Sequence, residues 1–230
     1  VFFNSEFHMD SFLKALPPFL RQFPDHQELE SVDFIRDKSQ LLYLGLDLQK
    51  FDAQKINHEK TPIILWNHRW EYDKNPDTFF SVLKKVNKSG IDFKLAVLGE
   101  NFSQFPETFS EAEKTFQQHI VQWGYSASFP DYAQWLWKAD IIPVTSNQEF
   151  FGGSVMEAMY CNTWPILPNR LTYPELLPPD LHHGHLYENE NDLCEKIIDA
   201  IQNIKQVRST YFHKIAKPLD WESMAPKYDD

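Results

Sequence analysis

Residues 140–168 read DIIPVTSNQEFFGGSVMEAMYCNTWPILP. Two short apolar runs, at 140–146 and 164–168, enclose a polar loop and a helical pattern that we expect to begin near Ser154. Apolar runs that do not alternate with polar residues are typical of strands buried on both faces of a parallel sheet. This stretch therefore predicts a strand, a helix and a second strand of an α/β domain.

The same alternation extends over residues 61–217. Further strands are predicted where short apolar runs occur, at 62–66, 93–99, 120–125 and 185–189. Helices are predicted where apolar residues recur at helical spacing, at 77–90, 109–119, 131–139 and 191–204. We therefore predict an α/β fold with a doubly wound parallel sheet.

The first sixty residues have a different character. Prolines at 17, 18 and 24 interrupt them, and only LLYLGLD at 41–47 is predicted as a buried strand. The chain also opens with apolar residues that have no preceding element to pair with. We expect residues 1–60 to be the end of an N-terminal domain and a linker, 61–217 the principal domain, and 218–230 a C-terminal tail.

Composition excludes several classes of protein. The chain has 22 Lys and Arg against 33 Asp and Glu, a formal charge of −11, so its overall field would not attract nucleic acid or an anionic membrane. Lys84, Lys85 and Lys88 form a small basic stripe, which we interpret as a solvated helix face and not as a site for nucleic acid. No stretch approaches the ~20 apolar residues of a membrane span. The two cysteines indicate neither a disulfide framework nor a zinc site and fit a reducing, cytoplasmic setting.

Two cations follow the strand predicted at 62–66. Ligands of doubly wound sheets bind beyond the carboxyl ends of the strands, where Arg69 and Lys74 would lie. An arginine fork and a lysine point charge can together hold a diphosphate. The alternative is an ordinary solvated loop.

Two carboxylates flank a pair of glycines after the strand at 140–146. Glu149 and Glu157 are eight residues apart, with Gly152 and Gly153 between them. A structural explanation for Glu157 is a capping box with Ser154. The functional explanation is a phosphate seat at the helix N-terminus, beside carboxylates that accept from sugar hydroxyls. A nucleotide sugar combines both groups, whereas the alternative use of paired carboxylates, glycoside hydrolysis, needs no phosphate seat.

The remaining clusters carry less information. His182, His183 and His185 have no partner at a recognisable metal-ligand spacing, so we expect a surface loop and no metal site. Most tryptophans are expected in the core. The run Trp123-Gly124-Tyr125, at the end of the strand at 120–125, is the better candidate for contact with a nucleotide base, because Gly124 lets a ring system approach the backbone.

The motif runs resemble a known family. EFFGGSVMEA at 149–158 resembles the E-x7-E motif of the family 4 retaining GT-B glycosyltransferases. The wider run at 146–177 and WNHRWEYDKNPDTFF at 66–80 are most similar to the tRNA-queuosine mannosyltransferase group. YLGLDLQKF at 43–51 resembles the interdomain linker, and FNSEFHMDSFL at 3–13 resembles the end of the N-terminal domain.

The resemblance implies a role for each matching residue. Arg69 and Lys74 would neutralise the donor diphosphate in place of a metal, and Glu149 would accept from the donor sugar. Glu157 would bind the ribose. The other implied donor contacts are the backbone of Phe150, Phe151, Gly152, Gly153 and Ser154, and the base region at Gly124 and Tyr125. The implied donor is GDP-mannose, the implied acceptor is queuosine in tRNA, and no cofactor is expected.

Two departures from the family pattern stand out. Asn75–Pro76 replaces the usual glycine after the diphosphate-binding lysine, and most of the N-terminal domain is missing. We therefore expect the chain alone to bind a guanosine nucleotide weakly and to transfer sugar poorly. Open alternatives are a glycosyltransferase or nucleotide-sugar epimerase with a non-RNA substrate, and a non-catalytic nucleotide-sugar-binding module. The sequence predicts no oligomeric state.

Overall fold

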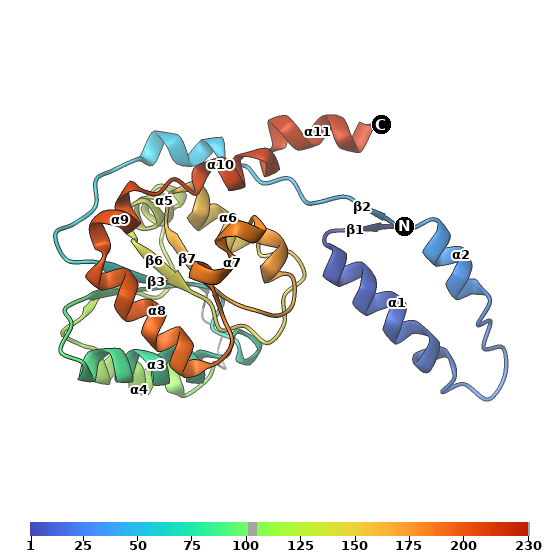
Figure 1. Ribbon diagram of the computed structural model, residues 1–230, viewed down its shortest axis with the longest axis horizontal. Helices are drawn as coiled ribbons and strands as arrows, with labels where there is room; N and C mark the ends of the chain where they lie inside the picture. Colours follow the sequence, from blue (N-terminus) through green and yellow to red (C-terminus); the bar gives the residue numbers. More distant parts are fainter. Residues whose placement is uncertain (101–104, 230) are drawn as a thin grey trace.

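The principal domain is built on one parallel sheet. The computed structural model describes residues 1–100 and 105–229, and within them six strands lie in the order β5-β4-β3-β6-β7-β8 (Figure 1). All pairs are parallel, which confirms the predicted doubly wound α/β fold. The strands are β3 (Ile63–Asn67), β4 (Lys94–Leu98), β5 (Ile120–Trp123), β6 (Ile141–Pro143), β7 (Trp164–Pro168) and β8 (Leu186–Tyr187).

Helices cover both faces of this sheet. One face carries α3 (Pro76–Lys88), α4 (Thr108–Thr115) and α8 (Glu190–Gln202), and the other carries α5 (Phe129–Lys138), α6 (Gly153–Tyr160) and α10 (His213–Ala216) (Figure 1). The other α-helices that follow β3 in the chain are α7 (His182–His185), α9 (Ile204–Ser209) and α11 (Trp221–Asp229). No helix among the described residues has the length and apolar character required to cross a bilayer.

Strand β3 shows how the core forms. Its residues alternate between the two faces, so that Ile63 and Leu65 pack with α5 and α6 while Ile64 and Trp66 pack with α3 and α4. All five residues of the strand are buried. From β3 the chain moves outward to β4 and β5 and then returns to β6 on the other side of β3. The switch point therefore lies between β3 and β6, and a ligand crevice is expected at their carboxyl ends.

The departure at Asn75–Pro76 has a conformational explanation. Asn75 adopts a left-handed φ of +54°, and its side chain accepts a hydrogen bond from the backbone N–H of Thr78. Pro76 then occupies the first turn of α3, where a missing N–H costs nothing. Asparagine tolerates this backbone region better than other side chains with a Cβ, so it can take the place of a glycine here.

Residues 1–44 form a small unit beside the sheet domain. Its elements are β1 (Phe2–Phe3), α1 (Glu6–Leu20), α2 (Ser31–Asp37) and β2 (Gln40–Leu41), and β1 pairs with β2 in parallel (Figure 1). The buried strand predicted at 41–47 is wrong, because within it only Leu41 belongs to a strand, Leu46 forms an isolated bridge with Asp220, and Leu44 is 43% exposed. A strand is buried only when sheet neighbours and a second layer cover it, and among the described residues this segment meets only the short β1 and that one bridge.

Helix α1 contacts the sheet domain through its first turn. The Glu175 carboxylate accepts the backbone N–H of Glu6 at 2.9 Å and that of Phe7 at 2.7 Å. The His8 ring lies 4.5 Å from the ring of Phe150. The first turn of α1 therefore lies against the loop that precedes α6.

The C-terminal segment also packs against the linker. The Leu46 N–H donates to the Leu219 carbonyl, and the Trp221 N–H donates to the Leu46 carbonyl. The Asp220 carboxylate accepts the backbone N–H groups of Leu48 and Gln49. Residues 217–229 are thus a short 3₁₀ helix, η5 (Lys217–Leu219), and the helix α11, held along the linker.

Candidate functional site

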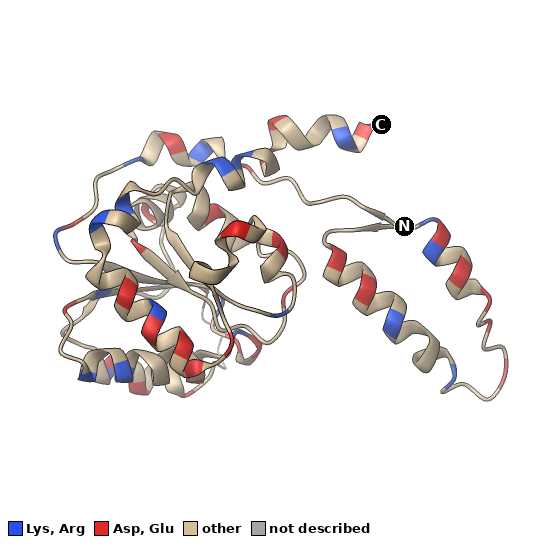
Figure 2. Cartoon of the chain, in the orientation of Figure 1, with Lys and Arg blue, Asp and Glu red and all other residues tan. Residues whose placement is uncertain are grey.

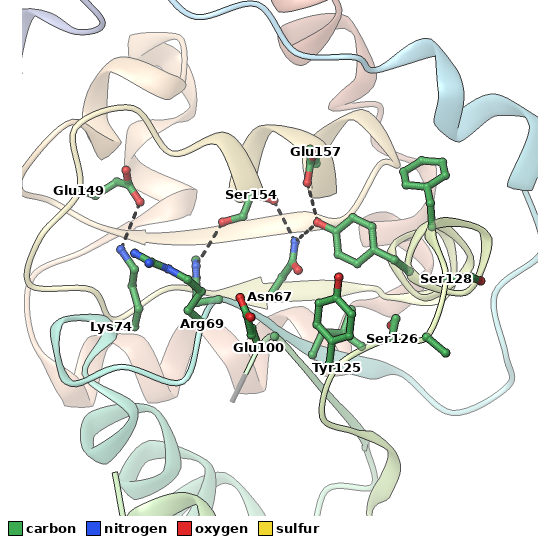
Figure 3. Close-up of a pocket in the computed structure, with 16 residues that line it drawn as sticks. Asn67, Arg69, Lys74, Glu100, Tyr125, Ser126, Ser128, Glu149, Ser154 and Glu157 are labelled. Carbon is green, nitrogen blue, oxygen red and sulfur yellow. Dashed lines mark hydrogen bonds and ion pairs between the residues drawn. The ribbon is translucent and has the colours of Figure 1, made fainter. Parts of the chain in front are cut away.

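A pocket of about 660 Å³ lies at the carboxyl ends of β3, β4 and β5, beside the start of α6. Six of the predicted site residues line it: Arg69, Lys74, Tyr125, Glu149, Ser154 and Glu157 (Figure 3). The sheet topology thus brings together residues that are up to 88 positions apart. This is the crevice expected at the switch point between β3 and β6.

The other predicted residues lie next to this pocket without lining it. They are Gly124, Phe150, Phe151, Gly152 and Gly153. Gly124 and Gly152 adopt φ values of +94° and +84°, which favour glycine, so both shape the backbone of loops that lead to the pocket. Phe150 is 46% exposed, whereas Phe151 is buried.

The two predicted cations differ in their surroundings. The Lys74 side chain is only 11% exposed, and its Nζ lies 3.1 Å from Asp73, 3.1 Å from the Gln148 carbonyl and 3.5 Å from Glu149. The Arg69 side chain is 58% exposed and pairs with Glu71 at 3.2 Å. Lys74 is therefore held in place, while Arg69 can reorient toward a ligand.

Glu149 turns back onto the loop that follows it. Its Oε1 accepts the backbone N–H groups of Phe150 at 3.0 Å and Phe151 at 3.2 Å, and its Oε2 faces Lys74 (Figure 3). Burial acts to raise the pKa of Glu149, but Lys74 and the backbone N–H groups outweigh it and lower that pKa. The carboxylate is therefore ionised, and it occupies amides that the resemblance assigns to the donor.

The capping box considered as the structural explanation of Glu157 does not form. Helix α6 begins at Gly153 with Gly152 as its N-cap, and no side chain caps it. The helix thus starts one residue earlier than expected, which places Ser154 inside the first turn. The Ser154 hydroxyl lies 3.2 Å from His68 Nδ1, and Glu157 Oε2 accepts from the Tyr132 hydroxyl at 2.5 Å.

Among the lining residues that the sequence analysis missed, Asn67, His68 and Tyr132 form hydrogen bonds with predicted site residues. The Asn67 amide donates to the Tyr132 hydroxyl at 3.0 Å and to the Ser154 carbonyl at 3.2 Å. Asn67 and His68 directly follow the residues predicted as a strand, so the rule used for Arg69 could have found them. Tyr132 lies in a helical pattern that gives no such signal.

Burial controls the ionisation of two pocket residues. Burial, with Lys74 as a second cause, lowers the pKa of His68 to about 4, so the imidazole is neutral at physiological pH. Burial also raises the pKa of Glu157, opposed by the Tyr132 hydrogen bond and by Lys50. The pocket thus presents a neutral histidine and a carboxylate whose charge depends on its neighbours.

The histidine cluster is structural. The surface loop predicted there is wrong, because these residues form α7 and His185 is buried, with Nδ1 2.8 Å from the Pro165 carbonyl. His182 Nε2 lies 3.0 Å from the Pro174 carbonyl. Among residues 1–100 and 105–229, no group of three His, Cys, Asp or Glu side chains is arranged to hold a metal ion.

The arrangement defines a class of protein. Cations, a helix N-terminus and carboxylates converge at the switch point of a doubly wound sheet, which is the arrangement of the nucleotide-sugar-binding domain of GT-B glycosyltransferases. Comparison with known families agrees. Residues 49–212 match the family described as glycosyl transferases group 1, and the chain belongs to this family. Residues 1–46 match the family described as tRNA-queuosine alpha-mannosyltransferase N-terminal.

Individual relatives of the chain include glycosyltransferases. The chain is 33% identical to the tRNA-queuosine alpha-mannosyltransferase of Drosophila melanogaster, over 100% of this chain and 63% of that protein. It is 21% identical to a probable sucrose-phosphate synthase of Thermosipho melanesiensis, over 90% of this chain and 50% of that protein. The chain therefore spans between half and two thirds of the length of these relatives.

Solved structures share the fold. The Anabaena protein Alr3699/HepE in complex with UDP-glucose superposes with a TM-score of 0.70 at 17% identity, over 100% of this chain and 62% of that chain. The sucrose-phosphate synthase of Thermosynechococcus elongatus gives a TM-score of 0.66 at 16% identity, over 93% of this chain and 64% of that chain. At these identities the similarity shows the fold alone.

Proposed function

We propose that this chain is the donor-binding part of a retaining glycosyltransferase that transfers mannose from GDP-mannose to queuosine in tRNA. The observation that carries the proposal is that Arg69, Lys74, Glu149 and Glu157 line the same pocket. Membership of the glycosyltransferase family supports sugar transfer, and the name of the Drosophila relative supports the acceptor. With tRNA as the acceptor, the proposal includes a cytoplasmic location.

The cations would act on the leaving group. As the sugar departs, negative charge develops on the nucleotide diphosphate, and fixed positive charge stabilises it. Lys74 is already held beside the pocket, and the exposed Arg69 is free to add a bidentate contact. Because the chain supplies these charges itself, the proposed reaction uses no metal and no cofactor.

Glu149 would exchange partners when the donor binds. In the structure its carboxylate occupies the backbone N–H groups of Phe150 and Phe151. A donor that takes these amides releases the carboxylate, which then accepts hydrogen bonds from sugar hydroxyls. Glu157 would accept from the ribose, and the exposed Tyr125 would lie near the base.

The acceptor would be bound largely outside this chain. Figure 2 shows Asp and Glu spread over α1, α2 and α8, with Lys and Arg interspersed among them. These three helices therefore offer no gathered basic face for the tRNA backbone, which needs positive charge. The proposal assigns tRNA contact mainly to the part of the Drosophila protein that has no counterpart here.

Calorimetric titration tests the donor assignment. We expect GDP-mannose and GDP to bind more tightly than UDP-glucose and UDP. Equal affinities, or no binding of any of them, would contradict the proposal. Transfer of labelled mannose to tRNA with queuosine, compared with tRNA lacking it, then tests the acceptor. We expect this chain alone to transfer poorly, and efficient transfer would show that it needs no further acceptor domain.

The alternatives predict different results. A nucleotide-sugar epimerase, or a transferase with another acceptor, would form product without tRNA. A non-catalytic module in which Glu149 and Glu157 are purely structural would keep its nucleotide affinity when Arg69 is replaced.

A further inference from the structure

Tyr132 forms the centre of a hydrogen-bond network on the pocket wall. Its hydroxyl donates to Glu157 Oε2 at 2.5 Å and accepts from the Asn67 amide at 3.0 Å. The same amide nitrogen donates to the Ser154 carbonyl at 3.2 Å. Figure 3 shows this network, in which Glu157 from α6 and Asn67 from β3 converge on one ring.

The network leaves part of one carboxylate open. Both hydrogens of the Asn67 amide have acceptors, and the Tyr132 hydroxyl has both a donor and an acceptor. Within the described residues, Glu157 Oε1 forms no hydrogen bond, and Glu157 lines the pocket. A carboxylate offers about four lone-pair positions. One oxygen of this pocket-lining carboxylate is thus fixed by Tyr132, while the other has no hydrogen bond to the described residues.

The hydroxyl contact also affects the charge of the carboxylate. Burial raises the pKa of Glu157, and the hydrogen bond from Tyr132 lowers it, with a smaller contribution from Lys50. The Tyr132 pKa is itself raised, by burial first and then by Glu157, so the phenol keeps its proton and remains a donor. Tyr132 therefore helps to keep Glu157 ionised as well as oriented.

We propose that Tyr132 is a positioning residue, which fixes the Glu157 carboxylate so that it binds the vicinal hydroxyls of a ribose and selects ribonucleotides. The inference rests on the proposed function, because it takes the ligand to be a nucleotide. A carboxylate held by one oxygen can accept one hydroxyl at Oε1 and a second at the remaining lone pair of Oε2. A deoxyribose cannot satisfy both positions.

The test is a titration of wild type and Tyr132→Phe with GDP and with 2′-deoxy-GDP. We expect wild type to prefer GDP by about tenfold or more, the effect of one hydrogen bond to a charged group. In Tyr132→Phe we expect the preference to fall to about threefold or less, because the carboxylate is no longer fixed. The fall in preference is the relevant readout, since a purely structural defect would weaken both ligands equally.

Tyr160→Phe is the matched control. Tyr160 lies on α6, the helix of Glu157, and its hydroxyl, like that of Tyr132, donates to a carboxylate, that of Asp52 at 3.1 Å. Neither Tyr160 nor Asp52 lines the pocket. We expect this variant to keep the wild-type preference. If Tyr132→Phe fails to fold, as judged by thermal unfolding, Tyr132→Leu provides the same test, because it also removes the hydroxyl that donates to Glu157.

Each outcome decides between the two proposals. If wild type binds GDP but does not prefer it over 2′-deoxy-GDP, or if Tyr132→Phe keeps the full preference, the role of Tyr132 is refuted and the donor assignment stands. The role of Tyr132 is also refuted if Tyr160→Phe loses the preference as well. Where Tyr132→Phe does not fold, a folded Tyr132→Leu that keeps the preference refutes it in the same way. If wild type does not bind GDP at all, both proposals fail.

Discussion

Replacement of Arg69 by alanine should separate nucleotide binding from stability. The Arg69 side chain is 58% exposed and its partner in the structure is Glu71, at 3.2 Å. Exposed ion pairs of this kind contribute about 0–1 kcal/mol to folding, so the variant should unfold at nearly the same temperature as wild type. Loss of a charge-assisted hydrogen bond to a diphosphate should instead cost about 1.5–3 kcal/mol of binding free energy. This corresponds to a dissociation constant for GDP that is roughly 10- to 150-fold higher.

Calorimetric titration with GDP and guanosine, together with thermal unfolding, measures both effects. Guanosine lacks the diphosphate, so its affinity should be the same in wild type and in Arg69→Ala. Arg36→Ala is a matched control, because Arg36 is 53% exposed, pairs with Asp33 and lies on α2, away from the pocket. The reasoning is refuted if Arg69→Ala binds GDP as wild type does, or if Arg36→Ala weakens GDP to the same extent.

Four further variants test the structure of the sheet domain. Gly152→Ala should destabilise the fold by about 1–2 kcal/mol and weaken GDP binding, because Gly152 has a φ of +84°. Gly153→Ala should be tolerated, because its added Cβ would meet no atom closer than 3.6 Å. Arg208→Ala should cost about 3 kcal/mol in denaturant unfolding without changing GDP affinity, because it leaves the fully buried Asp140 carboxylate without its 2.7 Å partner. Wild type should lose stability relative to Glu149→Gln as the pH falls below about 4.3. The pKa of Glu149 is lowered in the folded state, so its carboxylate stabilises the fold at pH values above the unfolded-state pKa. This stabilisation disappears when the carboxylate is protonated.

Each of these expectations has a contrary outcome. Equal stability of the two glycine variants would show that the left-handed backbone is not required at residue 152. A change in GDP affinity in Arg208→Ala would link the Asp140 ion pair to the pocket. Parallel stability curves of wild type and Glu149→Gln down to about pH 3, well below the unperturbed pKa of glutamate, would show that the carboxylate is not stabilised in the fold.

The sheet domain was predictable because its signals are local and mutually consistent. Short apolar runs became the strands β3 to β8, and the helical patterns between them became α3, α4, α5 and α8. The end-of-strand rule then identified Arg69 and Lys74 as neighbours of one pocket. The prediction of a buried strand at 41–47 was wrong because the apolar content of a segment does not show whether a neighbouring strand is present to cover that segment.

The errors within the site have tertiary causes. A capping box is a local motif, but the left-handed Gly152 starts α6 one residue early and Glu157 turns toward Tyr132, which is 25 residues earlier in the chain. Similarly, the sequence predicted free amides after Glu149 because it could not show that the carboxylate of this residue reaches them. These interactions depend on how α5, α6 and the loop pack, which no spacing rule describes.

The contact between α1 and the loop before α6 has a mechanical consequence. Any hinge motion that swings α1 away must break both hydrogen bonds to Glu175 and separate His8 from Phe150. Phe150 directly follows Glu149, and its own N–H is bound to that carboxylate. Displacement of α1 would therefore act on residues 149 and 150, and so on the Glu149 carboxylate that lines the pocket, although α1 itself does not line it.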